Sequence, residues 1–152
     1  AIFIANLFIP DGNIVSIVGR DNYRFDIYAQ DAEFEIDKPM IVLVDGASAS
    51  ASEILSGALK DYKRAKLLGT KTFGKGMVQK IMPQPNETGL NLTIAKYLTP
   101  SGSDINKKGI SPDIEVKLTA DDVKNRKDIQ LETAKKILSQ MIQQESTTAF
   151  KK

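Results

Sequence analysis

The chain contains no cysteine and no histidine. Without cysteine it has no disulfide, no thiol nucleophile and no thiolate metal site. Without histidine it cannot build a Ser-His-Asp triad of its own, and it cannot bind a metal through imidazole. Any general base in this chain must therefore be Lys, Asp, Glu or Tyr, and we expect neither a metal nor another cofactor.

Long apolar runs are also missing. The apolar segment at 1–10 is too short to span a bilayer, lacks a basic flank and ends in a turn, so we expect neither a signal peptide nor membrane insertion within this chain. The 21 Lys and Arg residues barely exceed the 19 Asp and Glu residues, and apart from the segment 60–66 they are scattered. This balance argues against a nucleic-acid partner.

With 152 residues, 41% of them hydrophobic, the chain has the size and composition of one globular domain. A helical pattern covers residues 1–8 and stops at a Pro-Asp-Gly turn. The apolar run at 39–45 is typical of a strand buried on both faces, and it is followed by a helical pattern and a second short apolar run. The sequence thus predicts an α/β fold in which 40–69 form a strand-helix-strand unit with parallel strands.

The remaining elements are mostly strands. We predict one strand pair from 13–19 and 23–29, and a hairpin from 77–83 and 90–98. A short strand at 114–118 follows a segment rich in turn-forming residues, and a helix is expected from about 126 to 143, with 144–152 as a loose tail. The predicted domain therefore covers 1–143.

The stretch DGASASASEI at 45–54 places three serines between a predicted strand and a predicted helix. Ser50 and Glu53 fit the capping box S-x-x-E, which would explain the serine by helix capping alone. The same position also suits a nucleophile, because backbone N–H groups at a helix start can receive a developing oxyanion. The presence of a base near the serine would distinguish a nucleophile from a helix cap.

Lys75 is the nearby candidate base, because glycines on both sides allow unusual backbone conformations and close approach of another segment. Gln79 lies four residues further in a predicted strand, where it could share a face with Lys75 and orient its amine. Residues 69–75 also fit the start of a phosphate-binding loop. Nucleotide binding is nevertheless disfavoured, because Gly76 stands where Ser or Thr is needed and a strand follows instead of a helix.

Several motifs together resemble one known family. The segments SASASEI at 48–54, TFGKGMVQ at 72–79, TPSG at 99–102 and GISPD at 109–113 occur in the order found in the carboxy-terminal processing, or tail-specific, proteases. These are serine peptidases with a Ser-Lys dyad and a crotonase-like α/β core. The similarity extends over most of residues 1–118.

The resemblance implies a role for each matching position. Ser50 corresponds to the nucleophile, Lys75 to its general base and Gln79 to the residue that positions the lysine. The backbone N–H of Ala51 would be one oxyanion donor, and Ser48 and Ser52 would be structural neighbours. A base has to be neutral, and moving a lysine pKa from near 10.4 to about 7 or 8 needs roughly 3–4 kcal/mol, which we expect an apolar pocket of Phe73, Met77 and Val78 to supply.

Family members cut proteins near their flexible carboxyl tails, usually outside the cytoplasm, and a homo-oligomer is compatible with the resemblance. The family's D-L-R-x-N-P-G-G stretch, which supplies a second oxyanion donor, and its PDZ domain have no counterpart in this sequence. We therefore expect a piece of a longer protease with weak or no activity by itself.

Two alternatives from other functional classes remain. The chain could be a peptide-binding or scaffold segment of a degenerate protease that adds peptides as strands to an exposed sheet edge. It could also belong to an acyl-CoA enzyme on the related crotonase fold, although such enzymes need no Ser-Lys dyad. The presence of Ser50, Lys75 and Gln79 favours the protease.

Overall fold

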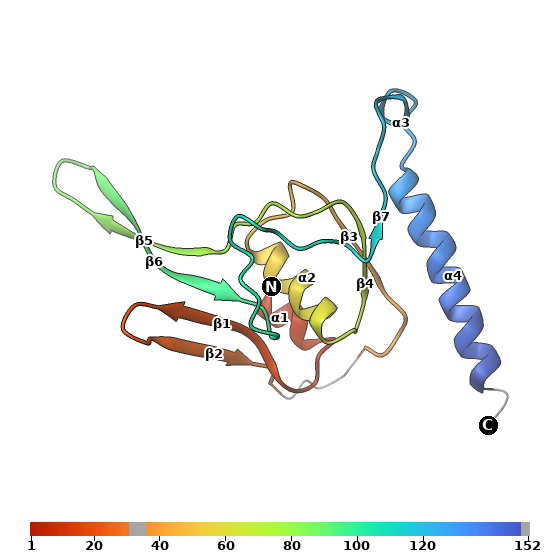
Figure 1. The fold of residues 1–152 in the computed structure, drawn as a ribbon, viewed down its shortest axis with the longest axis horizontal. Coiled ribbons are helices and arrows are strands. Elements are labelled where there is room, and N and C mark those ends of the chain that lie inside the picture. Colours follow the sequence, from red (N-terminus) through yellow and green to blue (C-terminus); the bar gives the residue numbers. More distant parts are fainter. Residues whose placement is uncertain (31–35, 150–152) are drawn as a thin grey trace.

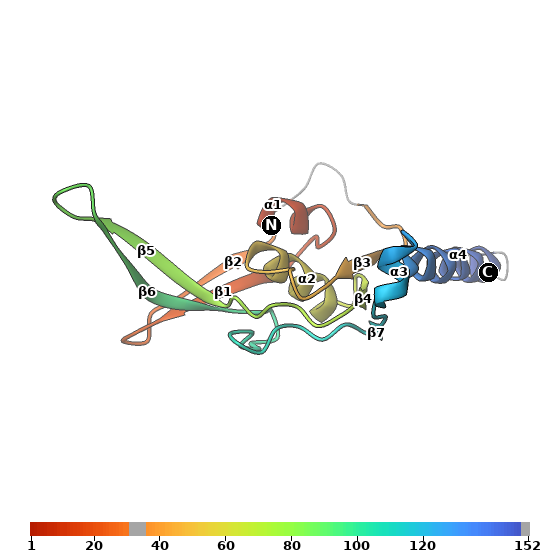
Figure 2. The ribbon, with the colours of Figure 1, turned by 90° about the horizontal axis from the view of Figure 1, so that it is seen from above.

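The computed structural model describes residues 1–30 and 36–149, which form two small sheets and four helices (Figure 1). The helices are α1 (Ile2–Asn6), α2 (Ala51–Asp61), α3 (Ala120–Lys124) and α4 (Ile129–Ala149). The strands are β1 (Asn13–Gly19), β2 (Arg24–Tyr28), β3 (Ile41–Val44), β4 (Lys66–Gly69), β5 (Met77–Pro83), β6 (Gly89–Leu98) and β7 (Ile114–Glu115). Seen from above, α2 lies between the two sheets (Figure 2).

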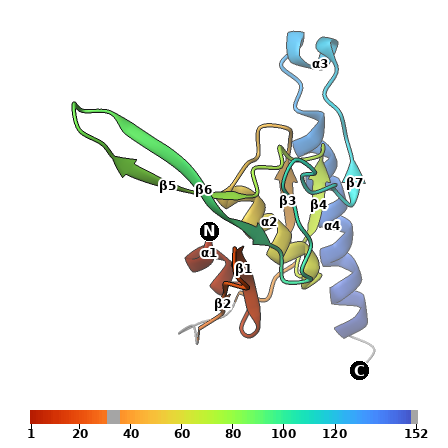
Figure 3. The same ribbon diagram turned by 60° about the vertical axis from the view of Figure 1, so that its left-hand side comes forward.

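The first sheet is antiparallel, with the strand order β2-β1-β6-β5. Both predicted strand pairs, β1–β2 and β5–β6, are confirmed. A register shift between Val78 and Gln79 bends the β5–β6 ladder. Beyond this point the hairpin projects from the body as an arm, which the three ribbon views show from different sides (Figures 1–3).

The second sheet has the order β3-β4-β7, and its strands run parallel. The predicted parallel pair of 40–69 is confirmed, because β3 pairs with β4 and α2 connects them. The prediction that β3 is buried on both faces is wrong. It is an edge strand of its sheet, and the Leu43 side chain remains 41% exposed. β7 is also shorter than the predicted strand at 114–118.

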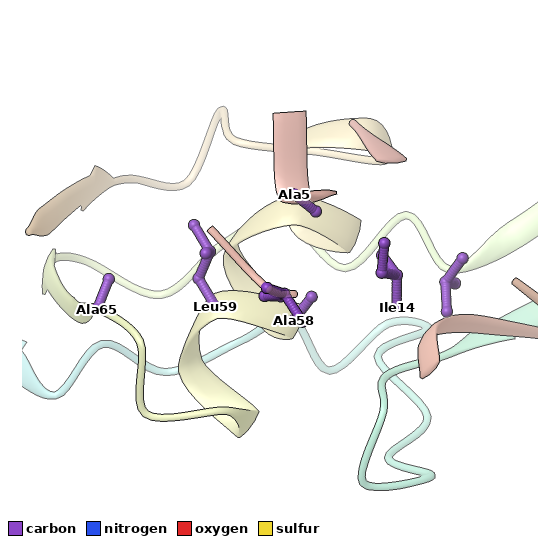
Figure 4. Packing of buried hydrophobic residues seen from close by; sticks show 7 residues of the cluster. Ala5, Ile14, Ala58, Leu59 and Ala65 are labelled. Atoms are coloured by element: carbon purple, nitrogen blue, oxygen red, sulfur yellow. The ribbon is translucent and has the colours of Figure 1, made fainter. Parts of the chain in front are cut away.

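The main hydrophobic core is assembled around α2. Ala58 and Leu59 of this helix pack with Ala5 of α1 and Ile14 of β1, and all four are at most 2% exposed (Figure 4). The opposite side of α2 carries Gly57, where an added Cβ would lie 3.1 Å from both Ile110 and Thr99. The helix therefore touches the 99–110 segment closely and is packed on two sides.

The C-terminal region differs from the sequence prediction in two ways. A separate helix, α3, precedes α4, and α4 runs to Ala149 instead of ending at about 143. Residues 144–149 of the expected loose tail are thus helical, and 150–152 lie outside the described residues. Among the apolar residues of α4, Ala134 is buried, whereas Ile142 is 49% exposed. Within the described ranges, no helix is both long and apolar enough to cross a membrane.

Candidate active site

Ser50 lies at the N-cap of α2, directly after a turn that Asp45 organises. The Asp45 carboxylate oxygen Oδ1 accepts hydrogen bonds from the Ala47 N–H at 2.9 Å and from the Ser48 N–H at 3.0 Å. The Ser48 hydroxyl lies 3.1 Å from the same oxygen. β3 thus ends in a turn that the Asp45 carboxylate closes, and the chain continues from this turn into α2.

Ser50 itself has an unusual backbone conformation, with φ 54° and ψ −113°. A positive φ is costly for a residue with a Cβ, on the order of 1–3 kcal/mol, and persists only where surrounding contacts enforce it. Here the Ser50 carbonyl oxygen accepts from the N–H groups of Glu53 and Ile54 at 2.9 and 3.0 Å. A conformation of this kind presents a serine at the tip of a strand-to-helix turn, as in nucleophile elbows.

Glu53 forms the predicted capping box with Ser50, but its carboxylate does much more. The side chain is fully buried and accepts four hydrogen bonds. Oε2 accepts from the Ser50 N–H at 3.0 Å and from the Lys75 N–H at 2.8 Å. Oε1 accepts from the Gly74 N–H at 2.7 Å and from the Thr72 hydroxyl at 2.5 Å. One carboxylate therefore joins the backbones of the predicted nucleophile and the predicted base.

Thr72 extends this network to a third segment. Its hydroxyl donates to Glu53 and accepts from the Ile110 N–H at 2.7 Å, while the Thr72 N–H donates to the Ile110 carbonyl at 3.1 Å. A further bond, from the Phe73 N–H to the Ser48 carbonyl at 3.0 Å, ties the lysine loop to the turn before Ser50. The two loops are thus joined at several points in the chain.

The glycines beside Lys75 allow the close approach that the sequence suggested. A Cβ added at Gly76 would lie 2.7 Å from the Asn106 nitrogen, and one at Gly74 would lie 2.8 Å from the Gly109 nitrogen. Gly74 also has φ +90°, and its carbonyl accepts from the Lys107 N–H at 2.8 Å. The 105–110 segment therefore lies directly against the Gly-Lys-Gly turn.

Asp104 anchors the start of that segment. Its carboxylate binds the Lys96 ammonium at 2.9 Å and accepts from the Asn106 N–H at 2.9 Å. The hydrogen bond from Lys96, followed by that from Asn106, holds the pKa of Asp104 below its ordinary value despite partial burial. The ionised carboxylate thus belongs to the folded arrangement of β6 and the 105–110 segment.

The expected apolar pocket around Lys75 is not formed within the described residues. Lys75 is exposed, and so are Phe73, at 65%, and Met77, at 38%. Only Val78 of the three predicted walls is partly buried. This part of the prediction is wrong, because Lys75 is held by its backbone N–H while its side chain remains exposed.

Gln79 does not share a strand face with Lys75 in the predicted way, because Lys75 lies in the loop before β5. Gln79 is paired with Thr93 across the hairpin, and its Oε1 accepts from the Asn91 side chain at 3.1 Å. The structure therefore gives this amide a partner on β6.

Ala51 and Ser52 occupy the first positions of α2. The first backbone N–H groups of a helix have no partner within the helix and carry its positive end. The Ala51 N–H thus belongs to the part of α2 that can receive a negative oxygen. Ser52 is exposed, and its N–H donates to the Ala49 carbonyl at 3.1 Å.

Sequence reasoning missed two residues of this site. Glu53 was assigned only to capping, and Thr72 received no role. The clue for Glu53 was its acidic side chain within a segment that otherwise forms the buried side of a helix, since carboxylates are almost never fully buried without partners. For Thr72 no local signal existed, because its partners lie 19 and 38 positions away.

Comparisons with known proteins show similarity to peptidases. The model of peptidase family S41 matches residues 1–116. A carboxy-terminal-processing protease of Bartonella bacilliformis is 50% identical over 119 residues, which are 76% of this chain and 27% of that protein. A carboxyl-terminal-processing protease of Synechocystis is 46% identical over 110 residues, covering 72% of this chain and 26% of the relative.

The fold is similar to solved protease structures. The photosystem II D1 C-terminal processing protease matches with a TM-score of 0.71 and 39% identity, over 76% of this chain and 30% of that structure. A peptidase of Parabacteroides merdae shares the fold with a TM-score of 0.74 at 20% identity, over 90% of this chain and 46% of that structure. The chain spans about a quarter of the length of the curated relatives it matches.

Proposed function

Because the chain belongs to peptidase family S41, we propose that it supplies the nucleophile and the general base of a serine endopeptidase that cuts proteins near their carboxyl tails. Ser50 is the nucleophile, Lys75 is the base, and Gln79 positions the lysine. The single observation that carries this assignment is the shared carboxylate oxygen of Glu53, which binds the backbone N–H groups of both Ser50 and Lys75.

The chemistry proceeds through an acyl-enzyme. A neutral Lys75 amine accepts the proton of the Ser50 hydroxyl as the oxygen attacks the peptide carbonyl, and the tetrahedral intermediate expels the amine product, which takes up the proton. Water then attacks the acyl ester while the Lys75 amine accepts its proton, and the bond between the carbonyl carbon and Ser50 Oγ breaks as Lys75 returns this proton to Oγ. The Ala51 N–H stabilises the oxyanion in both steps, and each such donor is worth roughly a hundredfold or more in rate.

Lys75 is exposed among the described residues, whereas its role requires an amine that gives up its proton. We propose that shelter for this amine comes from the substrate and from parts of a longer protein, of which residues 1–143 form the C-terminal part of a crotonase-like catalytic domain. The relatives are about four times as long as the matched segment, which supports this division.

Substrates and location follow from the same relatives. The partners we propose are proteins with flexible carboxyl tails, and the protein acts outside the cytoplasm as a monomer or a homo-oligomer. Relatives from bacteria and from chloroplasts are named as carboxyl-terminal processing enzymes, which supports this substrate class.

Labelling of the serine by a fluorophosphonate tests the assignment. In the natural protein that contains this chain, we expect the probe to modify Ser50, and Ser50→Ala to abolish labelling. Lys75→Ala and Lys75→Arg should reduce labelling at least a hundredfold, because neither side chain can take up the proton. Ser52→Ala is the matched control, since this exposed serine lies two positions away, and it should label like the wild type.

A second candidate function is a peptide-binding module without catalysis, and the exposure of Lys75 is the observation in its favour. The same experiment separates the two functions. A protein that binds unfolded polypeptides but whose Ser50 does not react with the probe is a binding module, and the proteolytic assignment is then wrong.

A further inference from the structure

The arm formed by β5 and β6 has an open edge next to the candidate site. In the strand order β2-β1-β6-β5, β5 is the last strand, and its outer edge pairs with no other strand of the described residues. β5 begins two residues after Lys75, whose N–H is bound to Glu53. The arm leaves the body at this point and runs away from it (Figures 1 and 3).

The arm is also apolar and lacks support. Of the seven residues of β5, six are exposed. Ile81 is 73% exposed, and on β6 Leu90 and Leu92 are 49% and 46% exposed. A two-stranded ribbon is marginally stable in water, whereas a third strand that covers apolar side chains stabilises it. A strand added along β5 would contact Ile81 on one face and Met82 on the other, because successive side chains alternate.

Edge strands are usually protected against such additions by charge. At the opposite edge of the same sheet, β2 carries the ion pair Arg24–Asp26, with a distance of 2.9 Å, within five residues. β5 carries only Lys80 within seven residues. β3 is another edge strand, but it has only four residues, of which Leu43 is the exposed one, at 41%. β5 is thus the longest open edge in the described part of the chain.

The charge around this edge indicates what it accepts. Lys80 lies on β5 and the exposed Lys75 lies two residues before this strand, whereas Glu87 lies in the turn at the far end of the arm. Lys107, in the segment that lies against Gly74, is also exposed. Complementary charge steers association, so the partner is an extended segment of negative net charge.

We infer that the outer edge of β5 binds an extended polypeptide segment with apolar side chains and flanking carboxylates, and leads it toward Ser50. The part of this inference that leads the bound segment toward Ser50 rests on the proposed function. It adds the mode of substrate binding, in which backbone hydrogen bonds to the edge give affinity and alternate side chains give selectivity.

The test uses the isotopically labelled 152-residue chain and a nine-residue peptide of alternating valine and threonine with a glutamate at each end. We expect the peptide to slow amide hydrogen exchange in β5 but not in β2 or β3. A further peptide carries an N-methyl group at every position and should not bind, because an added strand directs every second N–H to its neighbour. Equal binding of the methylated and unmethylated peptides, protection of β2 or β3 instead, or no binding at millimolar peptide overturns the inference.

Two matched variants locate the contact. Ile81→Ser should weaken binding by roughly fivefold to tenfold through loss of apolar contact. Phe25→Ser, at a comparably exposed aromatic of β2 (54%), should leave binding unchanged, and equal weakening by both variants contradicts the inference. In the natural protein Ile81→Ser should raise KM while kcat is retained. Because peptide binding does not need the Ser50 hydroxyl, Ser50→Ala should bind like the wild type, so failure of this inference is distinguishable from failure of the labelling experiment.

Discussion

The backbone N–H groups of Ser50 and Lys75, 25 positions apart in the sequence, donate to the same oxygen atom, Oε2 of Glu53. The arrangement fixes the main chains of two loops against each other and leaves both side chains unbound by this carboxylate. Because the acceptor is a buried charge with four donors, its loss leaves several polar groups without partners.

Glu53→Gln tests this role. Glutamine replaces one carboxylate oxygen by an NH2 group, and this group cannot accept the two hydrogen bonds that the replaced oxygen receives. We therefore expect the free energy of unfolding to fall by about 2–3 kcal/mol. Urea denaturation of the chain measures the change. Glu132→Gln, on the exposed side of α4, is the control and should change stability by less than about 0.5 kcal/mol. Similar values for both variants would show that the network is energetically unimportant.

Thr72 should act together with Glu53, because its hydroxyl both donates to this carboxylate and accepts from Ile110. Thr72→Val keeps the shape and removes both bonds, with an expected loss of about 2 kcal/mol. In a double-mutant cycle with Glu53→Gln the two losses should be coupled by at least about 0.5 kcal/mol. Additive losses contradict a shared network, and Thr72→Ser should restore most of the stability.

Alanine substitutions at two glycines distinguish the destabilisation caused by a steric clash from that caused by a positive φ. Gly76→Ala places a Cβ against the Asn106 backbone, at 2.7 and 2.9 Å from its nitrogen and Cα, and should cost about 2 kcal/mol of stability. Gly102→Ala has open space but φ +81°, so only the conformational cost of about 1 kcal/mol is expected. Thermal unfolding compares them. If Gly76→Ala is neutral, the 105–110 segment does not lie tightly against the lysine loop.

The positive φ of Ser50, the proposed nucleophile, predicts that a glycine at this position increases stability. Ser50→Gly relieves the positive φ of this residue and should raise the free energy of unfolding by about 1 kcal/mol, after the greater chain entropy of glycine is counted. Ala51→Gly, one position later and inside α2, should instead lower it by about 1 kcal/mol. Chemical denaturation of the two variants checks that their free energies of unfolding change in opposite directions.

Acid should weaken the 105–110 segment through Asp104, whose pKa is held below its ordinary value chiefly by the hydrogen bond from Lys96. A carboxyl group with a lowered folded-state pKa stabilises the protein fully above its unfolded pKa, near 3.9, and this contribution is lost as the pH falls through the folded pKa. Asp104→Asn should therefore lower the Tm at pH 7, and its difference from the wild type should shrink below about pH 4. A difference that is constant from pH 7 to pH 3 contradicts this linkage.

Local patterns predicted most of the fold. Alternating and continuous apolar runs located β1, β2, β5 and β6, and the Ser50–Glu53 capping box located the start of α2. The exposure of Leu43 could not be predicted, because a continuous apolar run does not reveal whether both faces of the strand are covered within the same chain. The end of α4 was also missed, since the polar residues after 143 carry no apolar stripe although they continue the helix.

The sequence suggested residues for the candidate site but not the connections between them. The spacing of Ser50 and Lys75 within motifs of one family pointed to both positions, and the two glycines indicated a close approach. That the approaching segment is 105–110, and that Glu53 and Thr72 join it to both loops, depends on long-range contacts without a local pattern. The exposure of Lys75 likewise follows from how this residue is anchored, through its main-chain N–H and not its side chain.

Anchoring through main-chain N–H groups has a practical consequence for work with this protein. The side chains of Ser50 and Lys75 can be exchanged without removing a hydrogen bond to the Glu53 carboxylate, because both donors are amide nitrogens that every residue except proline possesses. Variants made in this way would keep these two hydrogen bonds and, under the proposed function, could retain bound polypeptides for identification by mass spectrometry. The same variants could be crystallised together with a bound polypeptide.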